Sequence, residues 1–382
     1  MLNGETIIYF GPEPWDGLWR NRHQLMSRFA NENNVWYVEP PTNLRNLFSG
    51  RGRRRTRLYS QDASGVHVFH SPWWLPITGR APFKNISIRL FLSVLSLVAR
   101  TGRNRRPIVW LSRPNMVDYI DILRTKSTIY HVVDEYSGYG PPSAKPHSES
   151  RDNEEEMLRK ADTVIVVTST LFDLKSPHNA NTHLVPNAVD YESYANCDPQ
   201  TPDDISDIQG PIIGYSGLIA ARLDLGLLQT AAESRPDWNF VFVGAVNDAH
   251  CEAELRQLRE RSNVHFLGQK PVHDVPRYVQ QFDVCMIPYV LNLRAQHASP
   301  LKLYEYAAAS KPIVTTDFAA ARAFQGHVSV AGDTDEFIAV CERSLAMDPS
   351  AANILENRRF AAENTWSHRV QHISELLRNS VS

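Results

Sequence analysis

The stretch Ser299-Pro-Leu-Lys-Leu-Tyr-Glu-Tyr-Ala-Ala-Ala-Ser-Lys-Pro312 joins a short loop to a helix of small residues, and a strand, Ile313–Thr316, follows at once. The start of a helix suits an anion, because its free backbone N–H groups and its dipole favour negative charge. Lys302 adds a positive charge in the first turn, and Glu305 follows on the same face. A cation for phosphate and a carboxylate for sugar hydroxyls are what a nucleotide-binding site needs. The alternative is a packed helix whose Lys302 and Glu305 are merely solvated.

The second half of the chain alternates between apolar strands and helical stretches. The expected strands are Gly210–Gly217, Trp238–Gly244, Val264–Gly268, Phe282–Pro288 and Pro312–Thr316, and the expected helices are Leu225–Ala232, Ala249–Arg261 and Val272–Gln281. Such alternation is typical of a parallel sheet with helices on both faces, in which ligands bind beyond the carboxyl ends of the strands. We therefore expect Gly217, Gly244, Gly268, Tyr289 and the loop 299–305 to meet at one binding crevice.

The first half of the chain alternates in the same way. The expected strands are Ile7–Phe10, Val35–Val38, Val66–His70, Ile108–Leu111, Ile129–Val133 and Thr163–Val167, with a helix from about Arg20 to Asn31. A chain of 382 residues is long for one domain and natural for two. We therefore predict an α/β protein with two doubly wound, Rossmann-like domains that face each other across a cleft. The Asp- and Pro-rich segment Asn196–Gln209 is the expected interdomain linker, and Thr365–Asn379 is an expected final helix.

The composition is that of an ordinary soluble globular protein, with 42% hydrophobic and 21% charged residues. The four cysteines, Cys197, Cys251, Cys285 and Cys341, form no Cys-x-x-Cys pair. We therefore expect reduced, packed thiols rather than a disulfide or zinc framework. The N-terminus runs straight into the first strand without a signal peptide, so we expect a cytoplasmic protein.

Charge is distributed unevenly along the chain, although the formal net charge is only −2. Residues 1–126 hold 19 Lys and Arg against 8 Asp and Glu, a balance of +11, and the remaining residues balance at −13. The basic clusters are Arg51, Arg53, Arg54, Arg55 and Arg57, and Arg100, Arg103, Arg105 and Arg106. With the Trp73–Trp74 pair nearby, this pattern favours an anionic membrane surface or nucleic acid, and the alternative is a solvated loop.

The apolar run Ile86–Val98 lies between the two basic clusters and contains Arg89 and three serines. It is 13 residues long, much shorter than the roughly 20 apolar residues that a bilayer-spanning helix needs. A buried core helix is therefore favoured over membrane insertion. Peripheral contact with the inner face of the cell membrane is the remaining expectation for the basic half.

Five motifs of the second half occur in an order and spacing that resemble the donor half of GT-B glycosyltransferases. They are Pro186–Asp190, Gly214–Gly217, Val264–Gly268, Phe282–Asp283 followed by Ile287–Tyr289, and Pro300–Tyr306. The chain is similar to the family-4-like bacterial enzymes of surface polysaccharide synthesis, such as the teichuronic acid type. It also resembles the xanthan glucuronosyltransferase type. The likeness is clear over about residues 185–316 and looser in the first half.

The resemblance implies a GT-B fold with an acceptor-binding domain at 1–190, a donor-binding domain at 191–364 and a C-terminal helix, 365–382, that packs back on the first domain. It implies transfer of a sugar from a nucleotide-diphosphate sugar, with UDP favoured, to a hydroxyl of a saccharide or lipid-linked acceptor in cell-surface polysaccharide synthesis. The donor-binding residues that it implies are Gly217, Arg222, Gly244, Gly268, Tyr289, His297, Ser299, Leu301, Lys302 and Glu305.

Asp134 is the candidate catalytic residue, because it follows the strand Ile129–Val133 and a base must take the proton of the acceptor hydroxyl. In the xanthan glucuronosyltransferase type an Asp after the equivalent strand is the base of an inverting displacement, and Asp134 resembles it. The alternative is that Asp134 orders the loop that follows. His131 lies on the same strand but, by the two-residue period, points to the opposite face, so we expect a role in the core.

Two positions depart from the retaining family-4 pattern. That pattern has a Glu-x7-Glu motif, whose second Glu matches Glu305, but His297 stands at the first position. Arg222 is followed by Leu223 where a second basic residue is usual. We therefore expect Lys302 to neutralise the phosphates, and inversion is favoured over retention. There is no Asp-x-Asp motif, so we expect neither an essential metal nor another cofactor.

Three other classes of protein are alternatives. A nucleotide-sugar epimerase of the same fold would need several carboxylates and a His in one cleft, and the sequence does not place that set. A non-catalytic membrane or nucleic-acid adaptor would use the basic half, but Lys302 and Glu305 in a full donor half argue against it, as does the absence of a nucleic-acid motif. A dehydrogenase is the weakest alternative, since no Gly-x-Gly-x-x-Gly follows a strand.

Overall fold

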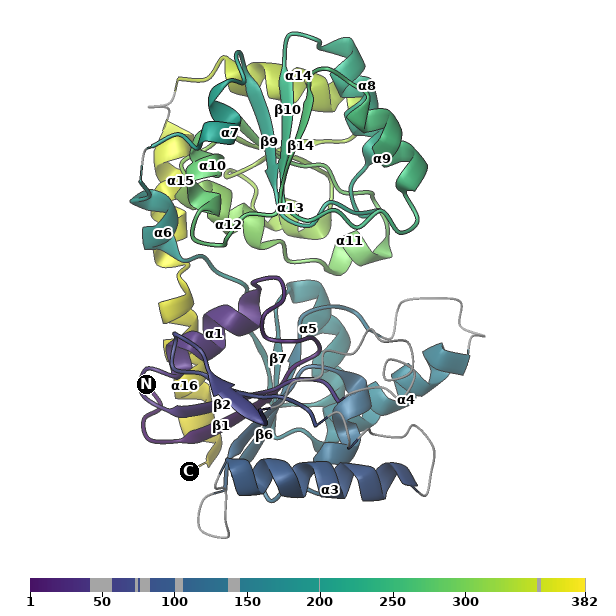
Figure 1. Ribbon diagram of the computed structural model, residues 1–382, viewed down its shortest axis with the longest axis vertical. Helices are drawn as coiled ribbons and strands as arrows, with labels where there is room; N and C mark the ends of the chain where they lie inside the picture. Colours follow the sequence, from purple (N-terminus) through teal and green to yellow (C-terminus); the bar gives the residue numbers. More distant parts are fainter. Residues whose placement is uncertain are drawn as a thin grey trace. The chain divides into compact units, whose positions relative to one another are not determined.

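The computed structural model describes residues 1–41, 57–72, 75, 83–99, 106–136, 145–198, 200–348 and 352–381. The chain divides into two compact units (Figure 1), Met1–Pro186 with Trp366–Ser382, and Asn187–Thr365. Each unit is built on a mostly parallel sheet with flanking helices, which confirms the predicted pair of doubly wound, Rossmann-like α/β folds.

The first unit contains an eight-stranded sheet in the order β3-β4-β2-β1-β5-β6-β7-β8. The strands are β1 (Thr6–Phe10), β2 (Asn34–Val38), β3 (Tyr59–Gln61), β4 (His67–Phe69), β5 (Ile108–Leu111), β6 (Ser127–Val132), β7 (Thr163–Val166) and β8 (Thr182–Leu184). Its helices are α1 (Asn21–Phe29), α3 (Phe83–Val98), η1 (Pro114–Tyr119), α4 (Lys145–Lys160), α5 (Ser169–Lys175), η2 (Ser176–His178) and α16 (Trp366–Val381). All strand pairs are parallel except β3 with β4.

Period-two alternation in the central strands divides the core of the first unit between the two faces of the sheet. On one face Phe10, Leu111 and Val132 belong to a cluster that includes side chains of α3 and α4. On the other face the Phe29 ring of α1 lies 5.8 Å from the ring of Trp110. Strands that are apolar on both faces can be read from the sequence, whereas the short, partly exposed edge strands β3 and β8 were not predicted.

The second unit contains a six-stranded, fully parallel sheet in the order β11-β10-β9-β12-β13-β14. The strands are β9 (Ile212–Ser216), β10 (Asn239–Val243), β11 (Val264–Gly268), β12 (Val284–Ile287), β13 (Ile313–Thr316) and β14 (Ser329–Ala331). The helices are α6 (Tyr191–Ala195), α7 (Asp203–Ser206), α8 (Leu225–Ser234), α9 (Glu252–Arg259), α10 (Val275–Gln280), α11 (Leu293–His297), α12 (Leu301–Ala308), α13 (Ala319–Ala323), α14 (Thr334–Leu345) and α15 (Ala352–Glu363). Figure 1 shows α8 and α9 on one side of this sheet and α10 and α12 on the other.

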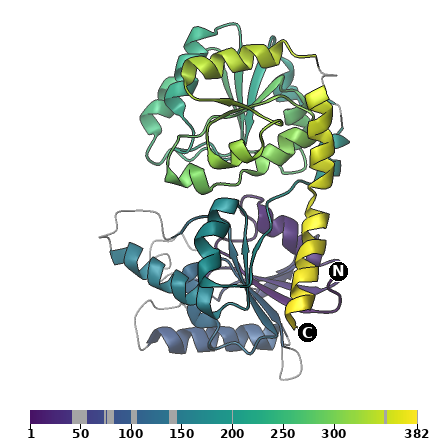
Figure 2. The ribbon, with the colours of Figure 1, turned by 180° about the vertical axis from the view of Figure 1, so that it is seen from behind.

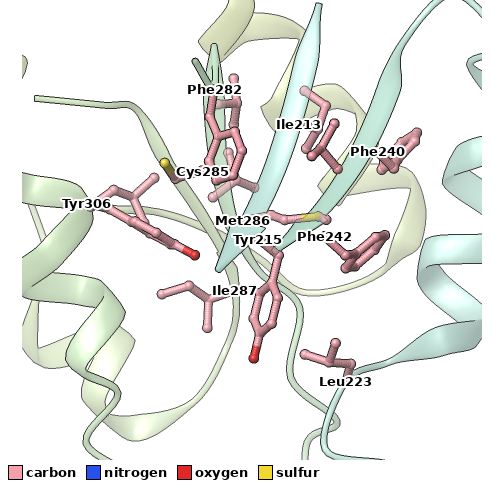
Figure 3. Close-up of a cluster of buried hydrophobic side chains, with 14 of the residues drawn as sticks. Ile213, Tyr215, Leu223, Phe240, Phe242, Phe282, Cys285, Met286, Ile287 and Tyr306 are labelled. Atoms are coloured by element: carbon pink, nitrogen blue, oxygen red, sulfur yellow. The ribbon is translucent and has the colours of Figure 1, made fainter. Parts of the chain in front are cut away.

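Large aromatic and aliphatic side chains fill the core of the second unit around β9 and β12 (Figure 3). Gly214 lies under the Phe282 ring, because a Cβ atom at this glycine would be 2.1 Å from a ring carbon. Tyr215 and Ile287 lie near the carboxyl ends of their strands, with Leu223 beyond Tyr215 (Figure 3). This packed base supports the strand ends that carry the candidate site.

The final helix, α16, belongs to the first unit and packs beside α1, and both chain ends are drawn in that unit (Figure 2). Its buried residues Trp366, Val370, Ile373 and Leu377 recur at the spacing of one helix face. The sequence predicts a helix over Thr365–Asn379, close to the bounds of α16.

The segment Asn196–Gln209 is not the boundary between the units, which corrects the expected linker. The units divide at Pro186–Asn187 and again at Thr365–Trp366, so the segment lies inside the second unit. Ile205 is buried in the core, and the Tyr278 hydroxyl donates a hydrogen bond to Asp204 at 2.7 Å. Asp- and Pro-rich composition is typical of a surface segment, but Ile205 and Asp204 attach this one to the second unit.

The apolar run Ile86–Val98 forms most of α3 and is only in part a core helix. Ile88, Phe91, Leu92 and Leu95 are buried and face the sheet. The opposite side of α3 is exposed and also carries apolar residues. Among the described residues, no helix has both the length and the apolar character needed to cross a membrane.

Candidate nucleotide-sugar site

The candidate site begins at α12, where Pro300 occupies the N-cap and supplies no side-chain cap to the free backbone N–H groups. The Asn187 side chain donates a hydrogen bond from Nδ2 to the Ser299 carbonyl oxygen at 2.7 Å. This contact joins the Pro186–Asp190 motif to the start of α12. Two motifs that lie more than 100 residues apart in the sequence therefore hold one helix start in place.

Tyr306 fixes α12 to the end of β9. Its hydroxyl is fully buried and accepts a hydrogen bond from the Ser216 backbone N–H at 2.9 Å. Lys302 lies one turn earlier on α12, and its Nζ sits 4.8 Å from the centre of the Tyr215 ring. Within the described part of the chain, no carboxylate oxygen lies within 4.0 Å of Lys302 Nζ. The ammonium group is thus held by packing and is available to a ligand.

Gly217 follows β9 directly beneath Lys302. A Cβ atom at this position would lie 2.5 Å from Lys302 Nζ, and the backbone has a φ of +132°. A residue with a side chain would therefore both strain the turn and displace the ammonium group. The glycine lets the lysine and the strand end come together.

Gly244 and Gly268 continue this edge of the sheet after β10 and β11. A Cβ atom at Gly244 would lie 1.9 Å from the Gly217 carbonyl oxygen. The Gly244 N–H donates a hydrogen bond to the Gly268 carbonyl oxygen at 2.8 Å. The three predicted glycines therefore form one continuous backbone rim along the carboxyl ends of neighbouring strands.

Arg222 and Tyr289 lie beside Lys302. The loop that carries Arg222 is bonded to the loop after β12, since the Val290 N–H donates to the Arg222 carbonyl oxygen at 2.9 Å. The Arg222 guanidinium carbon lies 5.8 Å from the centre of the Tyr289 ring. Burial acts to raise the pKa of the Tyr289 hydroxyl, but the charges of Lys302 and Arg222 outweigh it, so the pKa is lowered. Two positive charges, those of Lys302 and Arg222, therefore act on the Tyr289 ring at this end of the sheet.

Leu223 occupies the position at which a second basic residue is usual in the family pattern. It is 2% exposed and belongs to the hydrophobic core. Its loop pairs with Tyr289 in an isolated antiparallel bridge. Leu223 therefore supplies packing at this point, and the positive charge comes from Arg222 and Lys302.

Glu305 lies one turn after Lys302 on α12 and is partly buried. Burial raises the pKa of its carboxyl above the ordinary 4.5, while the charge of Lys302 and the Tyr194 hydroxyl oppose that rise. A carboxylate in this position can accept hydrogen bonds from vicinal hydroxyl groups of a sugar. The order along α12, cation first and carboxylate second, is the one that the sequence predicted.

The structure thus brings Gly217, Arg222, Tyr289, Lys302 and Glu305 together. Ser299 lies directly before α12, and its carbonyl oxygen accepts a hydrogen bond from Asn187 of the Pro186–Asp190 motif. His297 ends α11 and Leu301 begins α12, and both are partly buried. Donor-binding roles for all of these residues stay predictions.

Asp134 lies in the first unit, two residues beyond β6, and is partly buried. Its Oδ1 accepts a hydrogen bond from the Glu135 N–H at 3.1 Å. The backbone of the next residue therefore helps to orient the carboxylate. The catalytic role stays a prediction.

A buried ion network lies immediately beside Asp134, and the sequence did not reveal it. Lys175 Nζ lies 2.8 Å from Glu135 Oε2 and 3.0 Å from Glu154 Oε2. The Tyr130 hydroxyl donates to Glu154 Oε1 at 2.9 Å, and burial raises the pKa of that hydroxyl well above its ordinary value. The charged side chains come from a strand end and from two helices, so no spacing in the sequence marks them.

His131 is a core residue, as expected. It is 3% exposed, and its ring lies 5.6 Å from the ring of Trp110 on the face opposite Val132. Burial lowers the pKa of His131 from 6.5 to about 4. The neutral imidazole is therefore the form that the fold stabilises.

The predicted membrane-facing clusters lie largely outside the described residues. This holds for Arg51, Arg53, Arg54, Arg55, Trp73, Trp74, Arg100, Arg103 and Arg105. Arg57 and Arg106 are described and exposed. In the described ranges no group of three or more His, Cys, Asp or Glu side chains could hold a metal ion. The four cysteine thiols are free, and all but Cys197 are buried.

Residues 211–347 match the family described as glycosyl transferases group 1. Over 191 residues the chain is 30% identical to a teichuronic acid biosynthesis glycosyltransferase, TuaH, of Bacillus subtilis, with 48% of each protein covered. The chain therefore spans about half the length of this curated relative.

Solved structures match almost the whole chain. The sucrose-phosphate synthase of Thermosynechococcus elongatus has a TM-score of 0.74 at 14% identity, with 98% of both chains covered. The HepE protein of Anabaena, solved with UDP and glucose, has a TM-score of 0.70 at 15% identity, with 98% of this chain and 100% of that chain covered. At such identities the likeness establishes the fold alone. The chain therefore has a GT-B fold, and its residues 211–347 match the glycosyl transferases group 1 domain, in line with the resemblance to family-4-like glycosyltransferases.

Proposed function

We propose that this chain transfers a sugar from a nucleotide-diphosphate sugar, with UDP favoured, to a hydroxyl of a saccharide or lipid-linked acceptor in cell-surface polysaccharide synthesis. The observation that carries the proposal is the position of Lys302. Its ammonium group lies at a helix start, directly over Gly217, and no described carboxylate oxygen lies within 4.0 Å of it. The teichuronic acid relative and the UDP complex of HepE support the donor class and the polysaccharide role.

The diphosphate of the donor is assigned to the positive wall of the site. Lys302, Arg222 and the uncapped N–H groups of α12 supply charge and hydrogen bonds to the phosphate oxygens. As the bond between the sugar C1 and the phosphate oxygen breaks, negative charge builds up on the departing diphosphate. Fixed positive groups stabilise that charge without reorganising, which lowers the barrier. Glu305 is assigned to the ribose hydroxyls.

Asp134 is assigned the acceptor side of the reaction. Its carboxylate takes the proton from the acceptor hydroxyl, the acceptor oxygen bonds to C1 of the sugar, and the nucleoside diphosphate leaves with the bonding electrons. Attack from the face opposite the leaving group inverts the anomeric configuration, so an α-linked donor gives a β-linked product. No essential metal is proposed, because the site's own cations can neutralise the diphosphate.

Calorimetric titration with UDP tests the donor site. Lys302→Ala should weaken binding by about 1.5–3 kcal/mol, the scale of a hydrogen bond to a charged group, and Glu305→Gln should weaken it less. The matched control is Lys311→Ala, which removes a lysine from beyond the other end of α12, where its Nζ donates to the Gln280 carbonyl oxygen. Equal affinity of wild type and Lys302→Ala, or an equal loss in Lys311→Ala, would refute the assignment.

A further inference from the structure

The exposed side of α3 is an apolar surface that no described part of the fold covers. Ile86 is 54% exposed, Leu90 52% and Leu97 80%. With Arg89 and Ser93, which are also exposed, they recur at the spacing of a single helix face. These five residues are the outer face of α3. Both views draw α3 along the border of the first unit (Figures 1 and 2).

The sequence around α3 is uniformly basic. Residues 63–117 contain no Asp or Glu and hold eight Lys and Arg. Lys84 is paired with Asp118 at 2.6 Å, but Arg89 projects from the outer face of α3. A cationic segment with an exposed apolar stripe is attracted to negative charge and gains free energy when the stripe leaves water.

We propose that the outer face of α3 binds the surface of an anionic lipid bilayer. Leu90 and Leu97 would enter the boundary between headgroups and acyl chains, while Arg89 meets the anionic headgroups. The opposite face of α3 stays packed on the sheet through Phe91 and Leu95, so the helix lies along the membrane. At about 1.5 Å per residue its length is roughly 24 Å, which is too short to span the hydrocarbon core.

Charge favours lipid over a second copy of the chain. Two copies that met through the outer face of α3 would bring two acid-free, basic segments together, and like charges repel. Nucleic acid would pair with the cations but would not bury the leucine side chains, because phosphates offer no apolar surface. An anionic bilayer satisfies both features at once.

The test is co-sedimentation of the full chain with vesicles of pure phosphatidylcholine, or of phosphatidylcholine with phosphatidylglycerol, at low and high sodium chloride. We expect binding to the anionic vesicles at low salt and release at high salt, because the attraction is screened over about 10 Å at 0.1 M salt. The double variant Leu90→Gln/Leu97→Gln should bind roughly tenfold more weakly, since two exposed leucines no longer enter the bilayer. The matched control is Leu355→Gln, at a leucine of the second unit that is 60% exposed.

A second variant, Arg89→Glu, separates charge from apolar insertion. It should weaken binding to anionic vesicles without changing the small binding to neutral ones. Equal sedimentation with both vesicle types, or an equal loss in Leu355→Gln, would overturn the proposal. Two other results would also overturn the proposal. One is a dimer, detected by light scattering, that dissociates in Leu90→Gln/Leu97→Gln. The other is binding to DNA that the same double variant abolishes. The assay contains no nucleotide sugar, so its outcome is independent of the proposed transfer reaction.

Discussion

Lys302 and Lys175 both lie near the carboxyl ends of parallel strands, but their surroundings are opposite. Lys175 is 5% exposed and touches two carboxylates, at 2.8 and 3.0 Å. Lys302 rests on an aromatic ring, with no described carboxylate within 4.0 Å. A lysine neutralised by its own fold holds structure together, whereas a lysine held only by packing keeps its charge for a ligand. The first unit thus uses a buried lysine to hold a strand end in place, whereas the second unit leaves a lysine at a strand end without a carboxylate partner among the described residues.

The largest expected effect separates chemistry from donor binding. Asp134→Asn keeps the shape of the side chain but removes the proton acceptor, so turnover should fall by about 10²–10⁴. UDP affinity should not change, since the proposed donor-binding residues belong to the other unit. Steady-state kinetics and calorimetry measure the two quantities. Asp121→Asn, which alters an exposed partner of Lys160, is the control.

Product stereochemistry sharpens the same prediction. NMR of the product should show a β linkage from an α-linked donor. A retained α linkage would demote Asp134 to a positioning role and contradict the inverting mechanism, even if turnover falls.

The next effect tests whether the buried network stabilises the first unit. Lys175→Met leaves Glu135 and Glu154 buried without their cation, so the free energy of unfolding should fall by about 3–5 kcal/mol. Lys160→Met is the control, because Lys160 pairs with Asp121 and Glu156 at the surface, where such pairs contribute about 0–1 kcal/mol. Urea denaturation monitors both. Similar losses in the two variants would show that the network is not a special feature of this strand end.

Substitution of the glycines at the strand ends of the second unit should lower stability by different amounts at different positions. Gly244→Ala places a Cβ against the Gly217 carbonyl oxygen at a φ of +153° and should cost on the order of 3 kcal/mol of stability. Gly268→Ala meets no atom within 4 Å and bears only the strain of its φ of +73°, about 1–2 kcal/mol. Thermal unfolding compares them. Equal losses would mean that close backbone approach does not shape the rim.

The smallest expected effect is a pH-dependent increase in the free energy of unfolding when Glu305 is replaced by Gln. The pKa of Glu305 is raised above 4.5 by burial, so the folded state binds its proton more tightly than the unfolded chain does. The resulting stability is present below pH 4.5 and is lost as the pH rises through the folded pKa. Glu305→Gln should therefore unfold at higher urea than wild type at pH 7.5 and at the same urea near pH 4.5. A shift in the opposite direction, or one shared by the exposed Glu252→Gln control, would contradict this sign.

Much of the second unit could be predicted, because residues close together in the chain specify its strands and the start of α12. Strands such as β11 and β13 are short apolar runs that end in glycine or threonine, and their order predicted a parallel sheet with a site at its carboxyl edge. The cation and carboxylate of α12 were visible as a spacing of three residues. The strands β3, β8 and β14 were not predicted, because partly exposed strands of three residues carry no distinctive sequence pattern.

The sequence by itself determined the parallel parts of the two sheets, the strand-end glycines and the Lys302–Glu305 helix start. These features depend on the spacing of apolar residues and on residue size, which act between residues close together in the chain. Only the tertiary structure decided that Tyr306 would tie α12 to Ser216 and place Lys302 over Gly217. It also decided that Lys175 would join Glu135 to Glu154. Such contacts depend on how helices pack against strand ends, and a charge far along the chain becomes a partner only after the apolar faces have brought it there.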